Sequence, residues 1–142
     1  MPNIGFTEGK QQIGSAGIDW VNDDIRVLLV DDTCSASSEE DAVTISAITT
    51  LGELSGSGYV RKQLANKAVN KDNANDRSEL DADDITWSSI SAGTAAAAIV
   101  YKHITDDTDS IPLLYIDSNF PFVTNGGDFN LIWNSEGIAQ IA

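Results

Sequence analysis

Basic residues are scarce in this 142-residue chain, which has 8 lysines and arginines against 22 aspartates and glutamates and a net charge of −14. A protein that grips nucleic acid needs a basic surface to neutralise phosphates, so the composition argues against a nucleic-acid partner. Docking on an anionic membrane is disfavoured for the same reason. Such an excess of negative charge suits a protein that stays soluble at high local concentration.

Cysteine and histidine are almost absent. The single cysteine, Cys34, cannot form a disulfide within the chain, and a small buried side chain is its favoured role. With His103, the only histidine, it supplies just two thiolate or imidazole ligands, too few for a zinc site. A Ser-His-Asp triad would need His103, but the sequence has no Gly-x-Ser-x-Gly nucleophile elbow. We therefore expect no catalytic residues, no metal and no cofactor.

Long apolar runs are also missing. The longest clean run, Ala95 to Tyr101, falls far short of the roughly 20 residues that a membrane-spanning helix needs. Residues 1–5 show neither the basic start nor the apolar stretch of a secretion signal. We expect the chain to be made in a cytoplasm and to leave it only as part of a larger particle.

Short apolar segments alternate with acidic, glycine or asparagine turns from residue 25 onward, a pattern that predicts antiparallel strands. The expected strands are Ile25 to Asp31, Tyr59 to Val69, Ser78 to Trp87, Ala95 to His103, Leu113 to Asp117, Phe120 to Thr124, Phe129 to Trp133 and Gly137 to Ile141. Turns are expected at 72–76 and 125–127. The sequence therefore predicts a mainly β fold, in which residues 25–142 form one antiparallel β-sandwich or jelly-roll-like barrel.

One short helix is expected between residues 37 and 51. Ser37 or Ser38 can cap it, and the acidic residues 39–41 suit its positive N-terminus. Apolar residues that fall on one face of this helix are Ala42, Ile45 and Ile48. A β-branched run at 43–45 opposes the helix, and Gly52 ends it.

Residues 1–24 have neither helical nor strand periodicity, and glycines punctuate them. We predict an extended N-terminal arm that orders against a neighbouring subunit, with interface anchors at Phe6, Ile13, Ile18 and Trp20. A frayed terminus, or a strand added to the domain's own sheet, fits the same spacing.

Two acidic stretches, 72–84 and 106–109, invite comparison with calcium loops. They lack the glycine and the terminal glutamate of an EF-hand, and solvated acidic loops are favoured. The Gly56-Ser57-Gly58 segment lacks the third glycine and the Lys-Ser/Thr pair of a phosphate loop, so it is read as a turn. The tryptophans suit a core or an interface as well as a sugar-binding platform.

Four blocks of sequence together resemble a family of small virion structural proteins of tailed bacteriophages. They are residues 53–69, 74–87, 98–117 and 123–138, and they include a Gly-Tyr pair, Asp-Ala-Asp-Asp before Ile-Thr-Trp, Leu-Tyr-Ile-Asp and Asn-Gly-Gly-Asp. Members of this family resemble capsid cement or decoration proteins, which cap local three-fold points on the outer surface of a head. The resemblance implies the major capsid protein as partner, a homotrimer and no active site.

The expected function is therefore that of a capsid cement or decoration protein that stabilises the head from outside. One alternative within the same particle is a head-fibre or tail-associated protein that binds a receptor or a glycan. A small hydrolase is the remote alternative, because serines and carboxylates are abundant in the composition.

Overall fold

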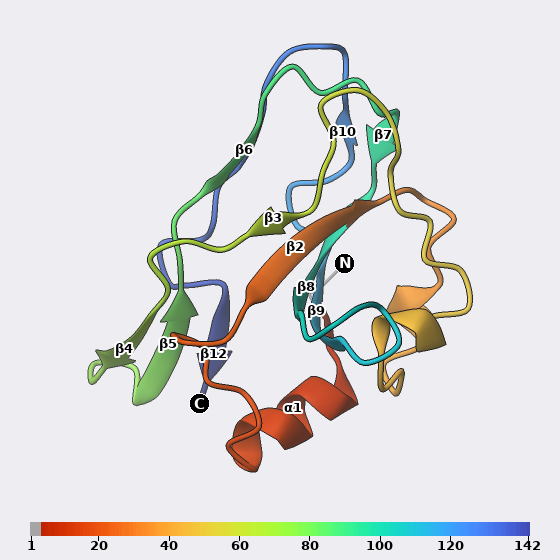
Figure 1. Cartoon of the computed structure of the whole chain (residues 1–142). Coiled ribbons are helices and arrows are strands. Elements are labelled where there is room, and N and C mark those ends of the chain that lie inside the picture. Colours follow the sequence, from red (N-terminus) through yellow and green to blue (C-terminus); the bar gives the residue numbers. More distant parts are fainter. Residues whose placement is uncertain (1–3) are drawn as a thin grey trace.

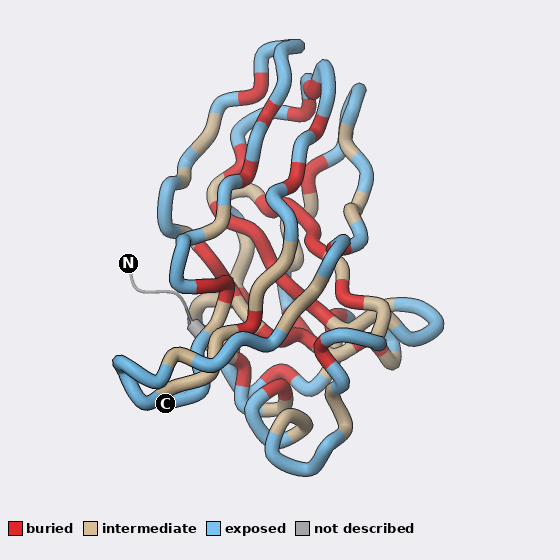
Figure 2. The backbone as a smooth tube through the Cα atoms, turned by 90° about the vertical axis from the view of Figure 1, so that its left-hand side faces the viewer, coloured by how far each residue is buried: buried red, intermediate tan, exposed pale blue. Residues whose placement is uncertain are grey.

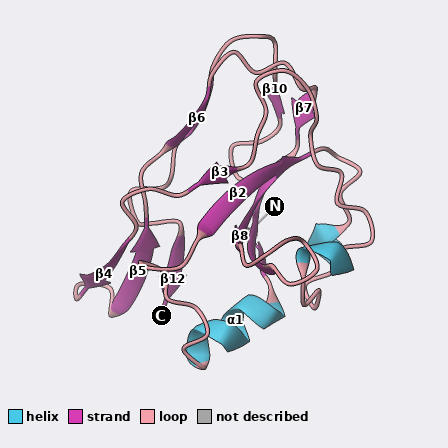
Figure 3. Cartoon of the chain, viewed as in Figure 1, coloured by secondary structure: helices cyan, strands magenta, loops and turns pink. Residues whose placement is uncertain are grey.

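The computed structural model describes residues 4–142 and shows a β-sandwich-like fold with one α-helix (Figures 1 and 3). Its strands form one five-stranded sheet, one three-stranded sheet and two two-stranded pairs, all of them antiparallel. Buried residues concentrate in the middle of the molecule, and the loops at its periphery are exposed (Figure 2). The predicted mainly β fold with one short helix is confirmed, and the sandwich-like architecture is the one observed.

The central sheet has the strand order β1-β9-β8-β2-β3. Its strands are β1 (Ile4–Gly5), β9 (Ile111–Ile116), β8 (Ala97–Lys102), β2 (Ile25–Val30) and β3 (Lys62–Gln63). The middle strands β2 and β8 are apolar along almost their whole length, and both faces of the sheet are covered. Alternate residues of these two strands therefore enter two separate cores.

The first core lies beneath a long ribbon that arches over the sheet (Figure 1). In this ribbon β6 (Ile85–Trp87) pairs with β11 (Phe129–Leu131), and β7 (Thr94–Ala95) pairs with β10 (Phe122–Val123). Hydrogen bonds between the backbones of residues 90 and 126–127 continue the pairing between the two halves. The ribbon closes one face of the sandwich.

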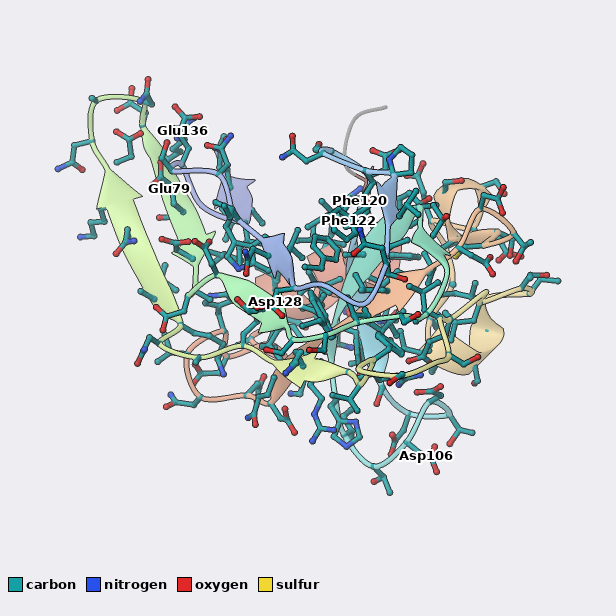
Figure 4. All side chains as sticks on the ribbon, turned by 90° about the horizontal axis from the view of Figure 1, so that it is seen from above. Glu79, Asp106, Phe120, Phe122, Asp128 and Glu136 are labelled. Atoms are coloured by element: carbon teal, nitrogen blue, oxygen red, sulfur yellow. The ribbon has the colours of Figure 1, made fainter. Side chains whose placement is uncertain are left out.

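Aromatic rings fasten this ribbon to the core. The Phe129 ring stacks on Phe122 with centroids 4.2 Å apart, and it meets Phe120 and Trp87 at 5.8 and 5.6 Å. Phe120 and Phe122 lie close together near the centre of the view from above (Figure 4). The Trp87 indole N–H also donates to the Val60 carbonyl at 2.7 Å, which secures the loop before β3.

The predicted turn at residues 125–127 does not close a hairpin. Gly126 has a φ of 90° and bends the chain, but the flanking strands β10 and β11 pair with β7 and β6 instead of with each other. The predicted turn is therefore a bend within the ribbon. The other predicted turn, at 72–76, is confirmed between β4 (Ala68–Asp72) and β5 (Arg77–Asp81).

A three-stranded sheet of order β12-β5-β4 stands beside the arched ribbon, with β12 (Ala139–Ile141) at one edge. Its β4–β5 hairpin projects from the body of the molecule (Figures 1 and 4). The Asp72 carboxylate shapes the hairpin turn, because it accepts bonds from the N–H groups of Ala74 and Asn75. Leu80 is the one buried residue within the three strands, and the other residues of this sheet are half-buried or exposed.

The predicted helix at residues 37–51 is wrong. Two short 3-10 turns stand there, η1 (Ala36–Ser38) and η2 (Ile45–Ala47), and Thr44 between them is extended. The backbone N–H groups of Ile45 and Ser46 donate to carbonyls of residues 110 and 107 instead of to a preceding turn. The apolar residues of the expected face are nevertheless buried, because this loop covers the second core.

The extended-arm prediction is wrong for residues 4–24, and residues 1–3 of that arm lie outside the described residues. The α-helix α1 (Thr7–Gly14) occurs here. Strand β1 precedes it and pairs with β9 at residues 114 and 115. Close packing of α1 on β9 depends on Gly9, where a Cβ atom would lie 3.0 Å from Leu113 Cα. The alternative of a strand in the domain's own sheet is the one observed for β1.

Candidate interaction groove

The four predicted interface residues lie in two different environments. Phe6 is fully buried in the second core, and Trp20 is 4% exposed in the first. The Trp20 indole N–H donates to the Asp81 carbonyl at 2.9 Å. Ile13 and Ile18 are half-buried and pack against the first core. In the folded chain, Phe6 and Trp20 are therefore core residues, and their role as partner anchors stays a prediction.

A groove of about 690 Å³ opens between α1 and β12, and we call it the α1–β12 groove. It contains two of the four predicted residues, Ile13 and Trp20. Its apolar lining is completed by leucines of β5 and β9 and by Ile138 and Ile141 near the end of the chain. Ile141 is 46% exposed, so the groove leaves an apolar side chain in contact with solvent.

Two strand edges border this groove. Strand β1 is an edge of the five-stranded sheet, and β12 is an edge of the three-stranded sheet. Gly5 of β1 and all three residues of β12 line the groove. An edge strand carries backbone N–H and C=O groups without ladder partners, which can pair with another extended chain. The groove therefore combines apolar surface with backbone hydrogen-bonding groups.

The charge of the groove differs from that of the chain. None of the residues lining it is acidic, and Lys10 of α1 is its one charged side chain. Lys10 reaches across β1, since a Cβ on Gly5 would lie 3.0 Å from Lys10 Cε. Within residues 4–142, Lys10 forms no ion pair. In a chain with 22 acidic residues, this surface therefore has no acidic side chain and one lysine.

The most extensive polar cluster elsewhere surrounds Arg61. Its guanidinium donates two bonds to Glu53, both 2.7 Å, and two to Asp107 at 2.6 and 2.9 Å. The pKa of Arg61 is raised, first by the bonds to Glu53 and then by those to Asp107. Tyr59 adds a 2.7 Å bond to Glu53, and burial raises the pKa of its hydroxyl. These side chains form hydrogen bonds with one another, so the cluster connects the loops that carry them.

His103 follows β8, and Cys34 precedes η1. The Nδ1 atom of His103 is buried without a hydrogen-bond partner, and the ring packs edge-on against Tyr101. Burial raises the pKa of the Cys34 thiol, which opposes formation of the reactive thiolate. Among residues 4–142, no three His, Cys, Asp or Glu side chains gather to hold a metal ion.

The acidic loops are shaped by their own hydrogen bonds. The Asp106 carboxylate accepts bonds from the hydroxyl and the N–H of Thr108, which lower its pKa. Asp109 accepts bonds from the N–H groups of Thr105 and Asp106, and its pKa is lowered as well. These aspartates thus stabilise the turn between β8 and β9.

Comparisons with known proteins give no relative. No protein family, curated protein or solved structure matches the chain. No helix in the described part of the chain is long and apolar enough to cross a membrane.

Proposed function

We propose that this chain is a structural protein of a tailed-phage virion, a capsid cement or decoration protein that binds the outside of the head. The observation that carries the proposal is the acid-free groove on an otherwise strongly acidic chain. A protein that coats a particle needs one face that docks and other faces that stay solvated. The resemblance of residues 53–138 to phage virion proteins supports the same function.

An external position follows from the charge. A net charge of −14 opposes contact with packaged DNA, whose phosphates carry a dense negative charge. Many acidic copies side by side on an outer surface also stay soluble before they assemble. The partner in this proposal is the major capsid protein, and the chain performs no chemistry on it.

We further propose a homotrimer, matched to the local three-fold points of a head. The projecting β4–β5 hairpin exposes Val69, which is 50% accessible, and β4 has an unpaired edge. Closed rings of copies are a common way to cover exposed edges. Mass measurement of the purified protein and of complexes released from particles tests this assembly. A chain that is monomeric in both states contradicts it.

The decisive experiment for the function is a reconstruction of particles with and without the protein. We expect density for the chain on the outer head surface, and we expect particles that lack it to rupture at lower temperature. Adding purified protein back should restore both properties. Density at a fibre or tail would support the receptor- or glycan-binding alternative, and absence from the particle would end the proposal.

A further inference from the structure

The α1–β12 groove offers three features to one ligand. The edge of β12 presents unpaired backbone groups, the floor of the groove is apolar, and Lys10 supplies a positive charge without an ion-pair partner among the described residues. An extended peptide can use all three at once. Its backbone pairs with the edge, and its side chains alternate between the two faces of the new strand.

We propose that this groove binds an extended segment of the capsid protein in which apolar and acidic residues alternate. The segment adds a strand beside β12, its apolar side chains contact Ile138 and Ile141, and a carboxylate lies next to Lys10. This inference rests on the proposed function, because it names the part of the partner that the docking face recognises. A strand of about four to six residues matches the usual length of strands in globular proteins.

A second copy of this chain is the less suitable occupant. The other edge strands of its two larger sheets are β3 and β4, and they carry Lys62 and Lys71. Each strand would carry a lysine into a groove whose one charged side chain is Lys10, which opposes pairing, and only β4 also carries an acidic residue, Asp72. The acidic residues 106 and 109 are held in a turn by their own hydrogen bonds, so they are not free to form a strand. Charge complementarity therefore favours a different protein.

The test uses the full-length chain labelled with ¹⁵N and three synthetic capped hexapeptides. In the first, valine and glutamate alternate. In the second, lysine replaces glutamate, and in the third, the valine–glutamate peptide carries N-methyl groups on alternate amides and cannot form a ladder. We expect saturable shifts of the Gly5, Lys10 and 139–141 amide resonances with the first peptide. The second and third peptides should bind more weakly.

The controls exchange charge on the protein. Lys10→Glu should weaken binding of the glutamate peptide by up to about fivefold, the upper end for an exposed ion pair, and should strengthen binding of the lysine peptide. Lys71→Glu is the matched control, because this exposed lysine lies on β4 outside the groove, and it should leave binding unchanged. Binding that ignores the charge exchange, shifts elsewhere on the protein, or no saturable shift at all each overturns the inference.

A parallel measurement on particles separates this inference from the proposed function. If wild-type protein and Lys10→Glu bind heads equally well, the cement function stands and the groove is not its docking site. If the peptides bind in the groove but the protein does not bind heads, the groove inference stands and the proposed partner is wrong. Concentration-dependent dimers that disappear in Lys10→Glu would identify a second copy as the occupant and refute the inference.

Discussion

Removal of the N-terminal segment should unfold this protein. Deleting residues 1–20 takes Phe6 out of the second core and Trp20 out of the first, and the two are 0% and 4% exposed. Truncating a buried Phe or Trp to alanine costs about 3–5 kcal/mol. The two losses together amount to about 6–10 kcal/mol, against a total stability of about 5–15 kcal/mol for a typical domain. We therefore expect the truncated chain to be unfolded or aggregated.

Point variants measure the same effect without truncation. Phe6→Ala and Trp20→Ala should each lower the free energy of unfolding by about 3–5 kcal/mol, measured by urea titration with far-ultraviolet circular dichroism. Trp20→Ala also leaves the Asp81 carbonyl without its indole donor. Val21→Ala is the matched control, because Val21 is 47% exposed and its loss should change stability by less than about 0.5 kcal/mol. A truncated chain that unfolds cooperatively at the wild-type midpoint would refute the assignment of this segment to the cores.

Three further variants test local features. Arg61→Met leaves the Glu53 and Asp107 carboxylates without the cation that they share. Because these side chains are 23–36% exposed, we expect the free energy of unfolding to fall by about 2 kcal/mol in urea titrations. Arg61→Lys should give an intermediate loss. Hydrogen bonds, first of all from the Thr49 hydroxyl, lower the pKa of Glu39 from its usual 4.5, so the ionised carboxylate stabilises the fold above pH 4.5. Glu39→Gln should therefore be less stable than wild type near neutral pH. The difference in stability should vanish as the pH falls through the lowered pKa. Gly58→Ala should lower the melting temperature more than Gly93→Ala does. Both glycines have positive φ (76° and 87°), but only at Gly58 would the new Cβ meet a backbone oxygen, at 2.5 Å. Equal melting temperatures for the two variants would contradict a close approach at Gly58.

The strands at the centre of the fold could be predicted because their signal is local. The apolar run at 25–31 reads as a buried strand wherever it lies in the chain, and β2 occupies residues 25–30. The turn at 72–76 is also local, since one aspartate and its neighbours form it. In both places the residues that decide the conformation lie within a few positions of one another.

Pairing and burial of distant segments could not be predicted in this way. Glycine at 126 signals a bend, but the partners of β10 and β11 lie much earlier in the chain, at residues 94–95 and 85–87. The segment at 37–51 has the apolar spacing of a helix, yet backbone bonds to residues 107 and 110 fix it as two 3-10 turns. Tertiary contacts override a weak local preference when the segment must cover a core.

The groove arises from a similar long-range arrangement. Phe6 enters the second core, so the chain leaves the edge of β9 after the two residues of β1 and continues as α1. The helix then lies beside β9, and β12 from the other end of the chain forms the opposite wall. The apolar character of Ile13 and Trp20 predicts that they contact apolar surface, but no local pattern indicates that they meet residues 138–141.

Among the edges of the two larger sheets, β3 and β4 carry a lysine, whereas β1 and β12 at the groove carry no charge. Proteins commonly place lysine on an exposed strand edge, because a buried charge opposes pairing with another chain. The edges β3 and β4 follow this rule with Lys62 and Lys71. The edge β12 breaks it, since Ala139, Gln140 and Ile141 carry no charge in a chain where 21% of residues do. An unprotected edge beside an apolar groove favours aggregation unless a partner covers it. Under the proposed function, the absence of a charged residue on β12 is the feature expected of a strand that a partner covers.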